Sequence, residues 1–116
     1  MKITLAAFAA SLLMAGMAAH ATAATGPQMG TIARVTIENY AFKSPSITVA
    51  RGSTVQWKNL DGDPHTVTAV NGSFDSKGLA HGDTFTFRFT KPGKYAYYCK
   101  VHPMMRGTVI VKEISS

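Results

Sequence analysis

The sequence contains a single cysteine, Cys99, so the chain cannot form an internal disulfide bond. Charge is also scarce, since charged residues make up 16% of the chain, with twelve Lys and Arg against six Asp and Glu. The basic residues are scattered, which argues against a nucleic-acid-binding surface. Repeats, long linkers and runs of like charge are absent. The 116 residues suffice for one hydrophobic core, which excludes a multidomain enzyme.

The one long apolar stretch lies at the N-terminus, where a positively charged start precedes an Ala-rich and Leu-rich run over residues 3–17 and then small residues. This layout is typical of a secretory signal peptide and is too short for a membrane-spanning helix. We expect residues 1–21 to be a cleaved signal peptide, with Ala23 as a second cleavage position. Residues 22–116 then form a single domain with a short flexible N-terminal segment. The expected location is the periplasm.

Apolar residues alternate with a period of two from Ile32 to Val111, which is the spacing of side chains on one face of a strand. The clearest case is 84–89, where three Phe side chains face one way and Thr, Thr and Arg the other. Turn residues separate the strands. We therefore predict an all-β antiparallel sandwich or barrel of seven or eight strands, and a loop over 73–81. The predicted strands are 32–38, 46–50, 54–59, 65–70, 84–90, 94–99 and 107–112.

The chemistry is concentrated after the strand that ends at Cys99. A thiolate, an imidazole and a thioether recur there at every third residue, as Cys99, His102 and Met105. A second histidine, His65, directly follows Pro64 at the start of another predicted strand. If those two strand ends are neighbours, all four donor groups converge on one point.

Two imidazoles, one thiolate and a weak thioether form the ligand set of a blue-copper electron-transfer site. Zinc more often takes four strong ligands, which would leave Met105 without a role. Met104 is an alternative axial ligand, one residue short of the regular spacing. His81 has no donor partner at ligand spacing and is interpreted as a surface histidine. The two carboxylates of the 61–63 segment indicate a turn rather than a calcium site.

With these residues in view, the chain resembles the cupredoxins, and its Cys-x-x-His-x-x-Met spacing is most similar to that of amicyanin within the plastocyanin-like group. The resemblance implies a Greek-key sandwich with one type 1 copper ion, His65, Cys99 and His102 as equatorial ligands and Met105 as the axial ligand. It also implies that Asn59 ties the His65 loop to the Cys99 loop. The residues that carry the resemblance are Phe42, 47–49, Gly52, 55–59, 63–67, 74–76, 93–95 and the Cys99 loop.

We therefore expect a soluble periplasmic carrier of single electrons, not an enzyme. Its expected partners are a redox protein donor and acceptor that dock transiently near His102, and we expect a monomer that binds no nucleic acid and does not insert into a membrane. A copper chaperone or storage protein is the alternative. A hydrolase that uses Cys99 and a histidine is disfavoured, because the loop offers no oxyanion hole and Met105 would be unexplained.

Overall fold

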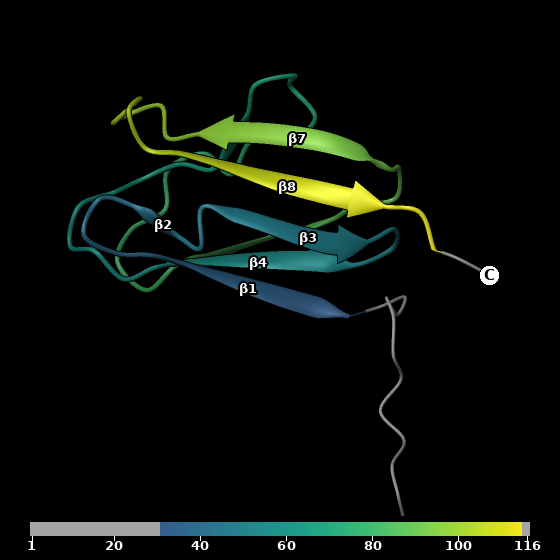
Figure 1. Ribbon diagram of the computed structural model, residues 1–116. Helices are drawn as coiled ribbons and strands as arrows, with labels where there is room; N and C mark the ends of the chain where they lie inside the picture. Colours follow the sequence, from purple (N-terminus) through teal and green to yellow (C-terminus); the bar gives the residue numbers. More distant parts are fainter. Residues whose placement is uncertain (1–30, 115–116) are drawn as a thin grey trace, which may run out of the picture.

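The computed structural model describes residues 31–114, which form two four-stranded β-sheets packed face to face (Figure 1). The first sheet has the order β2-β1-β4-β6 and the second the order β3-β8-β7-β5. The prediction of an all-β sandwich is thereby confirmed. The strands are β1 Ile32–Ile37, β2 Phe42–Lys43, β3 Ser46–Ala50, β4 Thr54–Asn59, β5 Thr68–Ala69, β6 Thr84–Arg88, β7 Gly93–Tyr98 and β8 Arg106–Lys112.

The direction of the strand pairing differs from the antiparallel arrangement that the sequence predicted. β1 runs parallel to β4, with Val35 opposite Trp57, and β3 runs parallel to β8, with Ile47 opposite Val109. The remaining pairs are antiparallel. Both sheets are therefore mixed, because the chain crosses between them instead of folding back through hairpins alone. Alternation shows which face of a strand is buried and says nothing about the direction of its neighbour.

The core between the sheets is rich in aromatic side chains. Trp57 is fully buried at its centre and packs edge-on against Tyr97, with a centroid distance of 5.4 Å. Phe85, Phe87 and Phe89 all face this core, as the alternation predicted. Burying a large apolar side chain contributes about 1.5 to 3 kcal/mol. This core holds the strand ends in place and with them the loops that follow.

Most predicted strand bounds agree with the structure within two residues, and two regions do not. The predicted strand 65–70 is reduced to β5, because His65 forms only an isolated bridge to Leu79. The short strand β2 was not predicted. The prediction of a loop over 73–81 is confirmed, because no named strand includes these residues. Two of its side chains, Phe74 and Leu79, are nevertheless buried.

The expected signal peptide, residues 1–21, and the segment that follows it lie outside the described residues. Within residues 31–114 there is no helix of the length and apolarity needed to cross a membrane.

Candidate metal centre

Three of the predicted donor residues, His65, Cys99 and His102, meet at one end of the sandwich, beyond the ends of β4 and β7. Cys99 directly follows β7, and the loop from it leads into β8. His65 lies in the segment between β4 and β5. In Figure 1 this end is on the left, where the β7–β8 connection and the β1–β2 connection are found. The strand order of the two sheets therefore brings distant sequence segments together, as the sequence hypothesis required.

The ligating atoms of His65, Cys99 and His102 lie within 4.8 Å of one another. The Cys99 sulfur is 3.7 Å from His65 Nδ1 and 3.9 Å from His102 Nδ1, and the two Nδ1 atoms are 3.2 Å apart. Metal bonds to imidazole and thiolate are about 2.0 to 2.3 Å long, so two donors of one ion lie at most about 4.6 Å apart. All three separations meet this condition. The group fits a single small metal ion.

The structure distinguishes the two adjacent methionines of the loop. Met105 is buried, with 5% of its surface exposed, whereas Met104 is 87% exposed. The Met105 backbone is also part of the loop's framework, since its amide donates to His102 O at 2.8 Å and its carbonyl accepts from the Cys99 amide at 3.1 Å. Burial and backbone anchoring favour Met105 over Met104 as the donor on this loop.

Cys99 is fully buried and is tied to the segment after His65 through Thr66, a residue to which the sequence interpretation assigned no role of its own. The Thr66 amide donates to the Cys99 sulfur at 3.3 Å, and the Thr66 hydroxyl accepts a hydrogen bond from the Lys100 amide at 2.8 Å. The Lys100 ammonium also contacts Asp75 at 2.7 Å, and this hydrogen bond lowers the pKa of Asp75. The loop that carries the thiol is thus fixed at its first two residues.

His65 is fully buried, and its outer ring nitrogen, Nε2, lies 2.8 Å from the Asp61 carboxylate. The same carboxylate accepts hydrogen bonds from the amides of Asn39 and Tyr40. Burial acts to raise the pKa of Asp61, but the amide hydrogen bonds and the contact with His65 outweigh it, so this pKa lies below its ordinary value of 3.8. Asp61 is therefore a carboxylate at neutral pH. The sequence signal was a carboxylate four residues before the histidine, which we interpreted only as part of a turn.

The structure corrects the role expected for Asn59. Its side-chain amide donates to the carbonyls of Asp63 and Leu79, both at 2.9 Å, and its oxygen accepts from the Asp61 amide. Asn59 therefore stabilises the His65 loop through hydrogen bonds inside that loop and one to the Leu79 segment. The connection to the Cys99 loop is made by Thr66 instead. His81 is exposed and contacts the Asp61 carbonyl, outside the donor group, as expected for a surface histidine.

Comparison with known proteins agrees with this fold and this donor group. Residues 5–111 match the cupredoxin-like domain. The chain belongs to the cupredoxin-like family. It is 34% identical to amicyanin-alpha of Methylorubrum extorquens over 112 residues, covering 92% of this chain and 94% of that protein. It is also 34% identical to the amicyanin of Paracoccus versutus over 83 residues, which cover 67% of this chain and 63% of that protein.

Solved cupredoxin structures are similar as well. A purple cupredoxin from Nitrosopumilus maritimus is 32% identical, with a TM-score of 0.64, and the match covers 69% of this chain and 99% of that one. A variant of amicyanin in its reduced Cu(I) form is 29% identical, with a TM-score of 0.66, over 78% of this chain and 86% of that one. The predicted family is confirmed. Amicyanins and plastocyanins are electron carriers and not enzymes, and the expected cofactor, one copper ion, is that of this cupredoxin group.

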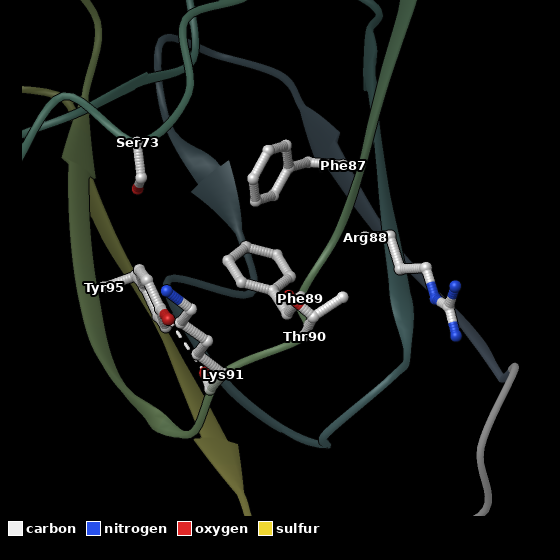
Figure 2. Close-up of a pocket in the computed structure, with 7 residues that line it drawn as sticks. All are labelled: Ser73, Phe87, Arg88, Phe89, Thr90, Lys91 and Tyr95. Atoms are coloured by element: carbon white, nitrogen blue, oxygen red, sulfur yellow. Dashed lines mark hydrogen bonds between the residues drawn. The ribbon is translucent and has the colours of Figure 1, made fainter.

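A hollow of about 200 Å³ lies at the opposite end of the sandwich, around the β6–β7 connection (Figure 2). Figure 2 shows the aromatic rings of Phe87, Phe89 and Tyr95 among the residues that line this hollow. The Tyr95 hydroxyl donates a hydrogen bond to the Lys91 carbonyl at 2.8 Å. None of its lining residues is a Cys, a His or a carboxylate, so it offers no metal donors. They are Ser73, Phe87, Arg88, Phe89, Thr90, Lys91 and Tyr95.

Proposed function

We propose that the chain is a periplasmic blue-copper electron carrier that binds one type 1 copper ion through His65, Cys99 and His102, with Met105 as the axial ligand. The observation that carries this proposal is the group of two Nδ1 atoms and one thiol sulfur, 3.2 to 3.9 Å apart. One thiolate, two imidazoles and a weak thioether suit copper better than zinc. A bound copper ion would supply a one-electron couple between Cu(I) and Cu(II).

The residues of the chain set the conditions for rapid electron transfer. His65 and Cys99 are completely buried, so they exclude water from the donor group. Hydrogen bonds from Thr66 and to Asp61 fix both side chains from outside the donor group. Donors that are fixed in this way move little between the two oxidation states. A small rearrangement favours rapid electron transfer.

His102 marks the route by which the electron would leave. Of the three donor residues, His102 is the one that is partly exposed. Exposed apolar side chains surround it: some are its neighbours in sequence, and one contacts its ring. Val101 is 53% exposed, Met104 87% and Tyr40 52%, and the Tyr40 ring lies edge-on to His102 with a centroid distance of 5.2 Å. We propose that a redox protein docks transiently on this rim, because small apolar interfaces dissociate quickly. Lys100 contributes little to steering an acidic partner, since Asp75 pairs with it.

The proposed role as an electron carrier is tested by measuring electron self-exchange between oxidised and reduced copper-loaded protein, using NMR line broadening. Met104→Glu places a charge on the rim without changing a donor, so we expect a nearly unchanged copper spectrum and slower self-exchange. The control is Ile32→Glu, which changes an apolar residue that is 49% exposed at the start of β1, the opposite end of the sandwich. Equal rates in both variants would show that the electron leaves elsewhere.

The periplasmic location depends on export, and we propose that residues 1–21 direct it. Mass spectrometry of the protein purified from the periplasm of an expressing bacterium should find a mature chain that starts at Thr22, or at Ala24 if the second position is cleaved. A chain that retains Met1 would contradict this part of the proposal.

A further inference from the structure

The Asp61 carboxylate accepts hydrogen bonds from three donors that belong to two different segments. Its Oδ2 atom lies 2.8 Å from His65 Nε2 and 2.9 Å from the Tyr40 amide. Its Oδ1 atom lies 2.7 Å from the Asn39 amide. The Asp61 side chain is 11% exposed and the His65 side chain is fully buried. One carboxylate thus joins the β1–β2 connection to a buried imidazole.

The contact with Asp61 determines which nitrogen of His65 is free. A carboxylate only accepts hydrogen bonds, so Nε2 must carry the proton. In the neutral ring Nδ1 is then the nitrogen without a proton, and it faces the Cys99 sulfur at 3.7 Å and His102 Nδ1 at 3.2 Å. This is the tautomer that a metal-binding imidazole needs, and the outer hydrogen bond sets it.

The same carboxylate stabilises an uncommon backbone conformation beside the site. Asn39 and Tyr40 have φ values of 55° and 58°, a left-handed conformation that non-glycine residues seldom adopt twice in succession. Both amides point at Asp61 in this conformation. The turn places the Tyr40 ring edge-on to both imidazoles, 5.4 Å from His65 and 5.2 Å from His102 between centroids. The Tyr40 hydroxyl donates to Asp63, so Tyr40 is held both at its backbone amide and at its hydroxyl.

We propose that Asp61 is a positioning residue that fixes the Nε2-protonated form of His65 and holds Tyr40 over the two imidazoles before a metal binds. The role of His65 as a metal donor rests on the proposed function. The contacts of Asp61 involve only residues of the chain, so the arrangement can be tested in the metal-free protein.

The test compares Asp61→Asn with Asp63→Asn. Both variants remove one negative charge from the same loop, but only Asp61 contacts an imidazole, whereas Asp63 contacts the Tyr40 hydroxyl. The Asp61 carboxylate accepts hydrogen bonds through both of its oxygens, whereas the side-chain amide of Asn has only one acceptor oxygen. In Asp61→Asn at least one of the three donors, His65 Nε2 and the amides of Asn39 and Tyr40, therefore loses its acceptor. Loss of a carboxylate that orients a histidine ligand typically weakens metal binding by about 10 to 100-fold.

Two measurements decide the proposal. The first is ¹⁵N NMR of the histidine rings in the metal-free protein, where wild type and Asp63→Asn should show one Nε2-protonated form of His65 and Asp61→Asn a mixture of forms. The second is the Cu(II) dissociation constant, which should rise at least tenfold in Asp61→Asn and stay near the wild-type value in Asp63→Asn. If Asp61→Asn does not fold, Asp61→Glu displaces the carboxylate by one methylene and is judged by the same two criteria.

The outcomes separate this proposal from the proposed function. If both variants show the wild-type histidine spectrum and the same Cu(II) affinity, Asp61 is not a positioning residue, and the blue-copper assignment is untouched. If wild type binds no Cu(II), the proposed function fails, and the histidine spectra of the metal-free proteins still decide the role of Asp61.

Discussion

The backbone amide of Thr66 lies 3.3 Å from the sulfur of Cys99 and donates a hydrogen bond to it across 33 positions of sequence. The Thr66 hydroxyl accepts a second hydrogen bond, from the amide of Lys100 at 2.8 Å. The Thr66 amide and the Cys99 sulfur are both buried. The segment after His65 therefore holds the thiol and the start of its loop in place.

Thr66→Val tests this brace, because it keeps the shape and the amide of residue 66 and removes only the hydroxyl. The Lys100 amide then loses its acceptor, and we expect the metal-free protein to lose about 1 to 3 kcal/mol of unfolding free energy. Urea denaturation measures the change. The control is Thr86→Val on the exposed face of β6. Equal effects of the two substitutions would contradict a special role for the Thr66 hydroxyl.

The sequence alone predicted most of the strands, their buried faces and the three residues His65, Cys99 and His102 that the structure brings together, because these depend on local patterns. The Phe residues of β6 alternate with Thr and Arg, and this alternation directly determines which side chains face the core. The donors of the Cys99 loop are three residues apart in a segment that leaves the sheet, so their proximity also follows from local geometry.

Features that depend on the three-dimensional arrangement could not be predicted from the sequence. The parallel pairing of β1 with β4 depends on how the chain crosses between sheets, which alternation does not encode. The contacts of Asp61 with the Asn39–Tyr40 turn join positions 21 and 22 residues apart. The role of Asn59 was predicted wrongly for the same reason, because its hydrogen-bond partner Leu79 lies 20 residues away in the sequence.

Gly107 leaves room for the Tyr97 ring, and adding a side chain there should destabilise the fold. A Cβ atom at this position would lie 2.8 Å from Tyr97 Cε2 and closer still to Cζ and the hydroxyl oxygen. Overpacking a core typically costs about 1 to 3 kcal/mol, which we expect for Gly107→Ala in thermal or urea unfolding. Gly78→Ala is the control, because no atom lies within 4 Å of its added Cβ. A Gly107→Ala variant as stable as the control would show that the contact is unimportant.

Tyr97 should make the protein less stable in alkali. Burial raises the pKa of Tyr97 to about 12, an effect that the neighbouring Trp57 side chain partly opposes, whereas the ordinary value is 10.0. Between these two values the unfolded chain releases a proton that the folded chain retains. The free energy of unfolding therefore falls as the pH rises, by up to about 1.4 kcal/mol per pH unit.

Tyr97→Phe removes this titrating group, so its stability should decline less steeply than that of wild type between pH 10 and 12. Urea denaturation of the metal-free proteins at several pH values gives both slopes. Parallel slopes for the two proteins would mean that another group causes the alkaline loss.

The two methionines of the loop should affect the copper site differently. Met105→Leu should keep the blue colour and raise the reduction potential, because a weak axial thioether stabilises Cu(II) slightly more than Cu(I). Met104→Leu should leave the potential nearly unchanged, since Met104 is 87% exposed. Cyclic voltammetry measures both potentials. The axial assignment is wrong if only Met104→Leu shifts the potential.

The most direct test of the copper assignment is the visible absorption spectrum of the oxidised protein loaded with one equivalent of Cu(II). A thiolate and two imidazoles around one ion, as the positions of His65, Cys99 and His102 predict, should give an intense blue thiolate-to-copper charge-transfer band. The band should disappear on one-electron reduction and be absent in Cys99→Ser. A colourless Cu(II) adduct of the wild-type protein, or an equally intense band in Cys99→Ser, would contradict the assignment.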